Sequence, residues 1–409
     1  MHERGVRLSA SGTPTETSGR EARPTEGVSD PLAIAFLGDA NSVHVRRWVT
    51  YFADRGHRIT LLVPRDQVVE PGYSAGVAVE LYTPNTGGPI GQLGMIASAW
   101  SVRRAVARIR PDILQIHYLT LNGLRGWMSG FHPYVATVWG NDVLIDPRRS
   151  LRARLLARLS LRSADLVTGI SRHVVDAAIE FGARPELTRV LHFGVDVDLF
   201  SPGPDPTALR RSLGLVGRRV LFSPRIIDRL YRHDVVVDAL AELPDDVTLL
   251  MTRYAAREDE LAALERHIAE KRLSGRVLIV PRVPSSEMPD FYRLADAVVS
   301  VPESDAGPVT LVEALAVGRP VVSSDLPPVR EWLAGIDPVC LVPVGDSAAT
   351  ATAIATVLTR GPQERAELAE MGRAAVLERA DQRRTMAEME ALYRQLAAGR
   401  QGKSAAGSS

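Results

Sequence analysis

The sequence predicts an α/β protein of two doubly wound domains, each a parallel sheet with helices on both faces. Three observations support this fold class. Short apolar runs alternate with helical segments along most of the 409 residues, which is the pattern of strand–helix–strand units. The segment 202–207 interrupts the alternation with three prolines in six residues, as expected of a hinge. The alternation then restarts, and the chain is long enough for two complete cores.

The first half begins with the apolar run 32–37, which ends at Gly38 and predicts a buried strand. A helix is expected over 44–55, ended by Gly56, and another over 91–110, ended by Pro111. Ser171 is placed to cap a helix that follows the last strand. The strands expected here are 32–37, 59–63, 113–117, 135–138 and 166–170, with a third helix over 148–162.

The second half repeats the pattern and closes with a helical block over about 362–396. Its expected strands are 220–223, 248–251, 277–280, 297–301, 320–323 and 340–342. Residues 1–30 are polar and lack an apolar run, so they predict a disordered arm rather than a signal peptide. We therefore expect domains at 31–201 and 202–375, a terminal helix at 376–396, and a small, polar, disordered tail at 397–409.

The composition excludes several classes of protein. The net charge of +1 provides no global field for nucleic acid. A single cysteine, Cys340, excludes an intramolecular disulfide and a cysteine-based metal cluster, and fits a reducing cytoplasm. The nine histidines are scattered without paired-ligand spacing, so no metal site is expected. No apolar run reaches the roughly 18 residues needed to span a bilayer.

The segment 304–316, Ser-Asp-Ala-Gly-Pro-Val-Thr-Leu-Val-Glu-Ala-Leu-Ala, has the clearest chemical signal. Gly307 permits a tight turn and Pro308 suits the first helical position, so a helix start here would favour an anion such as phosphate. Asp305 and Glu313 can both reach one ligand along that helix start, and carboxylates accept hydrogen bonds from hydroxyls. An anion and hydroxyls together suggest a sugar nucleotide. The alternative is a surface helix with two solvated acids.

Together with the Gly-Arg-Pro that follows at 318–320, this segment resembles the donor-site signature of family 4 retaining glycosyltransferases, which have the GT-B fold. The family usually has Glu where this chain has Asp305, which leaves the identity of the sugar open. The resemblance covers about 32–396 and implies that the terminal helix crosses back to the first domain. It also implies that Glu313 holds the ribose hydroxyls, while Asp305 and the backbone of Gly307, Pro308 and Val309 hold the sugar and the diphosphate.

Ligands of parallel sheets bind at the carboxyl ends of the strands. After the first strand come Asp39, Asn41 and His44, where the resemblance implies acceptor and phosphate contacts, with His44 best placed. His117 ends a later strand, although a lone histidine there is often structural. The next strand is followed by Trp-Gly-Asn-Asp where many relatives have His-Gly, so Asp142 becomes the leading polar candidate near the reacting carbon.

Two phosphates in a cleft need cationic partners, which also stabilise a departing diphosphate. Relatives have an arginine and a lysine after the first strand of the second domain. Arg225 matches the arginine, and Arg229, or next Arg232, would replace the missing lysine; the alternative is a set of surface arginines. The resemblance also implies that the backbone near Val283 contacts the base and that Glu331 braces the donor loop.

The implied reaction moves a sugar from a nucleoside-diphosphate sugar to an acceptor hydroxyl of a glycan, a lipid-linked molecule or a small molecule. It keeps the anomeric configuration and uses no metal and no cofactor. We expect four catalytic residues: Asp142, His117, Arg225 and Asp305. The alternatives are a GT-B epimerase, which would act without an acceptor, and a non-catalytic sugar-nucleotide-binding protein, which would bind the donor without transfer or hydrolysis.

The helix expected at 148–162 holds six arginines among leucines. A basic amphipathic helix can dock on anionic lipid, although one basic solvated face is commoner. We therefore expect a cytoplasmic protein with a candidate peripheral contact at the inner face of the membrane through 148–162.

Overall fold

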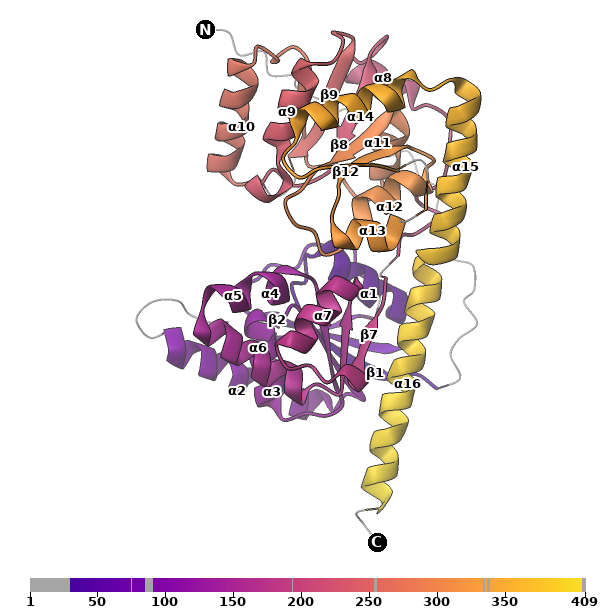
Figure 1. The fold of residues 1–409 in the computed structure, drawn as a ribbon. Coiled ribbons are helices and arrows are strands. Elements are labelled where there is room, and N and C mark those ends of the chain that lie inside the picture. The colour runs from indigo at the N-terminus through magenta and orange to yellow at the C-terminus, as the bar shows by residue number, and fades with distance from the viewer. Residues whose placement is uncertain are drawn as a thin grey trace, which may run out of the picture.

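The computed structural model describes residues 30–406 except 75, 85–90, 193, 254, 255, 334, 337 and 338. Two α/β domains lie one above the other, and the C-terminal helix runs beside the first of them (Figure 1). The first domain has a sheet of order β3-β2-β1-β4-β5-β6-β7, and the second has one of order β10-β9-β8-β11-β12-β13. All their neighbouring strands pair in parallel, which confirms the predicted fold class.

The first domain contains all the strands expected there and two more that the sequence analysis missed. β3 is largely exposed and β7 is three residues long, so neither forms a continuous apolar run at the edges of the sheet. The strands are β1 (Ala33–Leu37), β2 (Arg58–Pro64), β3 (Ala78–Tyr82), β4 (Ile113–His117), β5 (Tyr134–Val138), β6 (Leu166–Gly169) and β7 (Thr188–Val190). The helices are α1 (Val43–Asp54), α2 (Gly91–Ile109), α3 (Thr120–Ser129), α4 (Asn141–Leu144), α5 (Asp146–Arg149), α6 (Leu151–Ser163) and α7 (Arg172–Glu180).

The prediction of one helix over 148–162 was wrong at its start. Arg148 and Arg149 end α5, and a new helix, α6, begins at Leu151. Ser150 separates the two because its extended backbone lets Oγ accept a hydrogen bond from Ala153 N at 3.0 Å. A serine at this position is a favourable N-cap.

The second domain contains all six expected strands. They are β8 (Arg219–Ser223), β9 (Val247–Arg253), β10 (Val277–Pro281), β11 (Ala297–Ser300), β12 (Val321–Ser324) and β13 (Val339–Val342). The helices are α8 (Thr207–Ser212), the 3-10 helix η2 (Arg229–Tyr231), α9 (His233–Ala241), α10 (Glu258–Glu270), α11 (Met288–Leu294), α12 (Val309–Ala316), α13 (Pro327–Leu333), α14 (Ser347–Thr359), α15 (Pro362–Arg379) and α16 (Gln382–Ala406). Pro308 precedes the first residue of α12 rather than being that residue.

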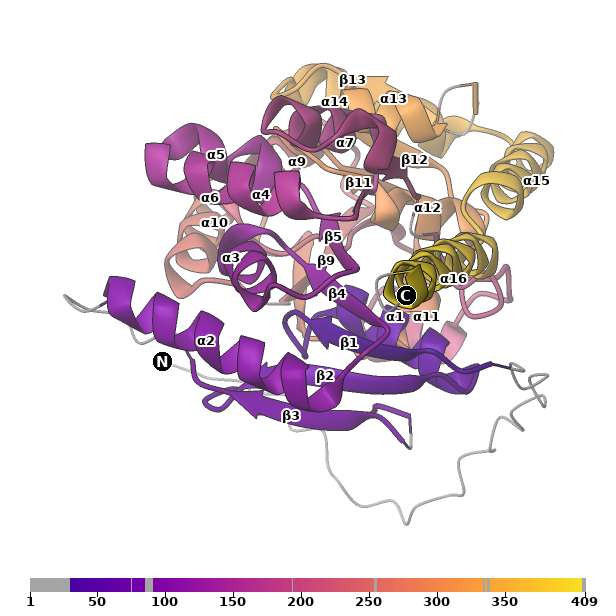
Figure 2. The same ribbon diagram turned by 90° about the horizontal axis from the view of Figure 1, so that it is seen from below.

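The chain returns to the first domain between α15 and α16, so the expected single block at the C-terminus is two helices. There Val195 N donates to Ala380 O at 2.8 Å, and Gln382 N donates to Val195 O at 3.1 Å. α16 then lies along the first domain (Figures 1 and 2), where Tyr393 Oη donates to Gln115 Oε1 at 2.6 Å. α16 continues to Ala406, so the prediction of disorder from 397 was wrong over 397–406. The alanines and long polar side chains of this segment are good helix formers.

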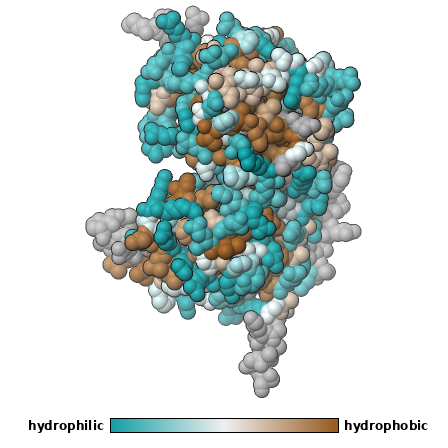
Figure 3. All heavy atoms as spheres, in the orientation of Figure 1, coloured by the Kyte–Doolittle hydropathy of each residue, from teal (hydrophilic) through white to brown (hydrophobic). Residues whose placement is uncertain are grey.

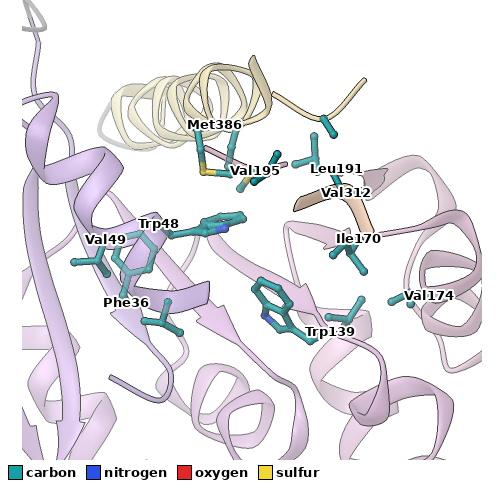
Figure 4. Close-up of a cluster of buried hydrophobic side chains, with 14 of the residues drawn as sticks. Phe36, Trp48, Val49, Trp139, Ile170, Val174, Leu191, Val195, Val312 and Met386 are labelled. Atoms are coloured by element: carbon teal, nitrogen blue, oxygen red, sulfur yellow. The ribbon is translucent and has the colours of Figure 1, made fainter. Parts of the chain in front are cut away.

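One buried apolar cluster runs through both domains. Figure 4 shows Trp48, Trp139 and Ile170 of the first domain with Val312 of α12 and Met386 of α16. Burial of apolar surface from both domains in this cluster stabilises the contact between them. The start of α12 is therefore held against the first domain, which positions the candidate site.

Candidate functional site

The loop before α12 rests directly on the first domain. Ser171 Oγ donates to Ala306 O at 2.7 Å, and the same serine caps α7 as expected, since it accepts from Val174 N at 3.4 Å. A Cβ at Gly307 would lie 2.9 Å from the side chain of Ile170. Gly140 has φ of +130°, and a Cβ there would lie 2.5 Å from Ala306 Cβ. The glycines at 140 and 307 are thus required by the close approach of the two domains.

Asp305 and Arg225, which were predicted separately, form one ion pair. Asp305 Oδ2 lies 3.1 Å from Arg225 Nη2, and each side chain is about one-tenth exposed. Asp305 Oδ1 accepts from the backbone N–H groups of Ala306 and Gly307 at 2.8 and 3.3 Å. Arg225 Nη1 donates to Thr310 Oγ1 at 3.2 Å. The pair therefore joins the loop after β8 to the first turn of α12.

Glu313, inside α12, has a partner on each carboxylate oxygen. Oε1 accepts from Arg47 Nη2 at 2.8 Å, and Oε2 accepts from Tyr292 Oη at 2.8 Å. Burial and the nearby Glu313 charge raise the pKa of Tyr292 well above its usual value, so the phenol stays a donor. Arg47 lies on α1 of the first domain. The sequence analysis did not select Arg47, because nothing in the local pattern relates it to a residue so distant in the chain.

His44 is half-buried beside these charges. Its ring centroid lies 4.2 Å from that of Trp139. Burial, with repulsion from Arg47 and Arg225, lowers the pKa of His44 to about 3. The imidazole is therefore uncharged at neutral pH, and one of its ring nitrogens is a donor while the other is an acceptor. The structure thus brings His44 and Arg47 of the first domain together with Arg225, Asp305 and Glu313 of the second.

His117 and Asp142 are buried and contact residues that surround the cluster. His117 is fully buried and its Nδ1 accepts from Trp139 Nε1 at 3.2 Å. Burial, and less strongly repulsion from His44 when both rings are protonated, lowers the pKa of His117 to about 3. Asp142 is 3% exposed and accepts from the backbone N–H groups of Leu119, Trp139 and Gly140 at 2.9, 3.1 and 2.9 Å. Burial raises the pKa of Asp142, although these bonds oppose the rise. These contacts hold Trp139 and Gly140 in place, while the catalytic roles of His117 and Asp142 stay predictions.

Asp39 and Asn41 connect the loops that follow β1 and β2. Asp39 Oδ1 accepts from Asn41 N at 2.9 Å and from Gln67 Nε2 at 2.5 Å. Asn41 Nδ2 donates to Val68 O at 2.8 Å, and Asn41 Oδ1 accepts from Glu70 N at 2.9 Å. These contacts hold the loop that leads to His44, and the acceptor contacts expected of Asp39 and Asn41 stay predictions.

The arginines expected to replace the missing lysine do not join the cluster. Arg229 is exposed in η2. Arg232 is paired with Asp234 and Glu303, each at 2.9 Å. In this structure the second cation beside the donor-loop acids is Arg47 instead. Val283 lies half-buried in the loop after β10, and its predicted contact with the base stays a prediction.

Glu331 of α13 braces the two domains against each other. Its two carboxylate oxygens lie 2.8 and 2.7 Å from Arg172 N, the first residue of α7, and Oε1 lies 3.2 Å from His192 Nε2. A carboxylate at the start of a helix is favoured by the helix dipole. The neighbouring Trp332 Nε1 donates to Ile170 O at 3.2 Å.

Two pockets lie near this junction. One of ≈ 400 Å³ lies in the first domain beside Asp142, among α2, α3, α5 and α6. Another of ≈ 390 Å³ is lined by residues of α7 and by Ser304, which precedes Asp305. Among the residues that the structure describes, no group of three or more histidine, cysteine or acidic side chains could hold a metal ion. None of the helices in the described ranges is long and apolar enough to cross a membrane.

Comparison with known proteins gives consistent matches. Residues 33–171 match the family described as glycosyl transferase 4-like, and residues 207–375 match glycosyl transferases group 1. The D-inositol 3-phosphate glycosyltransferase of Mycobacterium sp. (strain JLS) is 30% identical over 392 residues, which cover 85% of this chain and 83% of that protein. The enzyme of the same name from Mycobacterium tuberculosis (strain F11) is 28% identical over 323 residues, 72% of this chain and 66% of its own length.

Two solved structures have the same overall fold. Anabaena Alr3699/HepE in complex with UDP-glucose superposes with a TM-score of 0.75 at 22% identity, covering 89% of this chain and 100% of that one. Sucrose-phosphate synthase from Thermosynechococcus elongatus superposes with a TM-score of 0.78 at 21% identity, covering 90% of this chain and 99% of that one.

Proposed function

The chain belongs to the group 1 glycosyltransferases and has the GT-B fold, and we propose that it is a retaining, metal-independent member that needs no cofactor. Membership of the family makes it an enzyme that transfers a sugar from a nucleotide sugar. The proposal adds retention of the anomeric configuration, a hydroxyl acceptor and the roles of individual residues. The cluster of Asp305, Glu313, Arg225, Arg47 and His44 between the domains is the observation that carries it.

The cluster has the chemistry that a nucleoside-diphosphate sugar needs. Carboxylates accept hydrogen bonds from sugar and ribose hydroxyls, and arginines pair with phosphate oxygens. When a donor binds, a ribose hydroxyl would replace the Arg47 guanidinium as the hydrogen-bond partner of Glu313 Oε1. The freed guanidinium would then lie near Arg225 with its charge directed to the diphosphate. We propose UDP-sugars as the first donors to test, because HepE is similar in fold and was solved with UDP-glucose.

The proposed reaction occurs on one face of the sugar. The bond between the anomeric carbon and the phosphate oxygen breaks, and its electron pair leaves with the diphosphate. The acceptor oxygen forms a new bond to the same carbon, and its proton passes to the departing phosphate oxygen. Arg225 stabilises the charge on the leaving group, neutral His44 donates or accepts a hydrogen bond, and the contact between domains excludes water.

The proposal also covers where the enzyme works in the cell. We propose that the enzyme works in the cytoplasm, with no nucleic-acid partner, and that the segment 148–162 contacts the inner face of a membrane. Leu151 and Leu155 on this segment are 80% and 57% exposed, and arginines flank them. Apolar side chains beside exposed cations suit a lipid surface.

The test is a thermal-shift screen of the full chain with nucleoside-diphosphate sugars in the presence of EDTA. A donor that binds only the folded state stabilises it by roughly 2.7 kcal/mol at a hundredfold excess over its dissociation constant. A shift with one donor, lost in Glu313→Gln and retained in the exposed control Glu265→Gln, supports the site. Product NMR then reports the anomeric configuration. A shift that requires a divalent metal, or a product of inverted configuration, contradicts the proposal.

A further inference from the structure

Three neighbouring helices of the first domain form a basic surface. α2, α3 and α6 contain three, one and four arginines and no aspartate or glutamate. Arg125 is buried and Arg108 pairs with Glu80 of β3, while the other arginines leave this side basic in a chain whose net charge is only +1. Arg152 Nη2 of α6 contacts Met95 Sδ of α2 at 2.9 Å, which shows that the two outer helices meet. We call this surface the α2–α3–α6 face.

The same face exposes large apolar side chains. Figure 3 shows hydrophobic and hydrophilic residues together on this side of the first domain. Three of these side chains, Leu93, Ile96 and Trp100, lie three and four positions apart on α2, so they line one side of that helix. The exposed fractions are 66% for Leu93, 45% for Ile96, 52% for Trp100, 40% for Trp127, 80% for Leu151 and 57% for Leu155. An apolar patch of this kind on a soluble domain marks an interaction site.

The pocket of ≈ 400 Å³ opens within this face. Its volume is in the range of small-molecule sites. Apolar walls come from Met95, Leu119, Leu156 and Ala157, while Arg149 and Arg152 are exposed lining residues. Two acids also line the pocket: Asp142, whose carboxylate accepts from three backbone N–H groups, and the half-buried Asp146. A ligand held here would thus have an apolar part beside an anionic part.

The pocket is also connected to the donor loop. Asp142 lines it, and the carboxylate of Asp142 holds Gly140 N at 2.9 Å. Gly140 in turn lies against Ala306, which follows Asp305. A ligand in the pocket is therefore separated from the donor loop by a single layer of backbone.

We infer, on the basis of the proposed function, that this pocket receives the hydrocarbon end of an anionic amphiphilic acceptor presented by an anionic lipid bilayer against the α2–α3–α6 face. The exposed leucines and isoleucine enter the apolar boundary of the bilayer. Tryptophans suit its interface because they combine an apolar ring with an N–H donor. The arginines attract the anionic headgroups, and the three helices present no carboxylate to repel them.

Vesicle flotation tests the face. The full chain should float with vesicles that contain phosphatidylglycerol at least tenfold more than with phosphatidylcholine alone, and added salt should reduce the difference. Leu151→Ser/Leu155→Ser and Arg149→Glu/Arg152→Glu should each lose most of this binding. Matched controls on the second domain, at the exposed Val216→Ser and Arg266→Glu, should bind like the wild type.

Dodecyl phosphate tests the pocket. It should raise the melting temperature of the wild type at concentrations where inorganic phosphate does not, and Ala153→Phe, which fills the pocket, should abolish the shift. Thr120→Trp, at an exposed lining position, replaces Ala153→Phe if that variant does not fold. The donor-induced shift should remain in every folded variant of this set.

The outcomes separate this inference from the proposed function. A donor shift without selective vesicle binding overturns the inference and the proposed membrane contact of 148–162, and a donor shift with equal effects of dodecyl phosphate and phosphate overturns the inference alone. Both results leave the proposed sugar transfer intact. Loss of the donor shift in the wild type contradicts the proposed function, whatever the vesicles show. Lipid-free self-association that Leu151→Ser/Leu155→Ser abolishes would assign the face to a second copy of the chain and would also overturn the inference.

Discussion

Arg47 Nη2 lies 2.8 Å from Glu313 Oε1, so an ion pair joins α1 of the first domain to α12 of the second. The two side chains are 21% and 9% exposed. The donor signature assigns this same carboxylate to the ribose. The proposed ribose contact and the observed contact between the domains therefore involve the same carboxylate.

Glu313→Gln should weaken donor binding at least tenfold. The amide keeps the shape of the side chain but loses its charge and replaces one acceptor oxygen with a donor. Hydrogen bonds to charged groups contribute about 1.5–3 kcal/mol, which corresponds to a factor of roughly 10 to 150. Calorimetric titration with the donor measures the change. Affinity equal to that of the wild type would remove Glu313 from the ribose site.

Arg225→Ala should lower kcat by roughly a hundredfold or more, as does the removal of one charge-stabilising donor in other enzymes. Arg225 is the buried partner of Asp305, whereas Arg229 is exposed. Arg229→Ala is therefore the matched comparison, measured by steady-state kinetics at saturating donor. Equal losses in the two variants would place both arginines at the diphosphate, as the sequence analysis predicted.

Gly307→Ala should force the domains apart, because the added Cβ would lie 2.9 Å from Ile170. We expect a lower kcat and a larger radius of gyration in solution scattering. Ile170→Ala removes the obstructing atoms, so Gly307→Ala/Ile170→Ala should recover part of the loss. If the double variant is as impaired as the sum of the single ones, the contact does not explain the glycine.

The free energy of unfolding should fall as the pH decreases below about 6.5. The pKa values of His44 and His117 are lowered to about 3 in the folded protein, so below their usual pKa of 6.5 the unfolded chain binds more protons. Their contribution is complete above about pH 6.5 and is lost as the pH falls towards 3. Each such group gives a slope of up to about 1.36 kcal/mol per pH unit.

Urea unfolding at about pH 7.5 and about pH 5 measures this slope. His117→Phe keeps an aromatic ring beside Phe36 and removes one titrating group, so its stability should depend less on pH than that of the wild type. His173→Gln, at an exposed position, is the control. An unchanged slope in His117→Phe would show that His117 is not the source of the dependence.

The interior of each domain could be predicted from the sequence, because buried parallel strands are continuous apolar runs. The segment 297–301 and β11 illustrate this agreement. The strands β3 and β7 could not, since edge strands are short or half-exposed and lose that signal. The end of α16 was missed for a related reason. Its last turns are polar, and composition alone does not distinguish a polar helix from a disordered tail.

The sequence by itself determined the two-domain order and the signature acids Asp305 and Glu313, because these depend on local patterns along the chain. Only the tertiary structure decided which charges meet. Arg47 and Glu313 are 266 positions apart, and no local pattern records such a contact. The burial of His117 and Asp142 and their hydrogen-bond partners are likewise set by packing in space, and the catalytic roles predicted for them stay predictions.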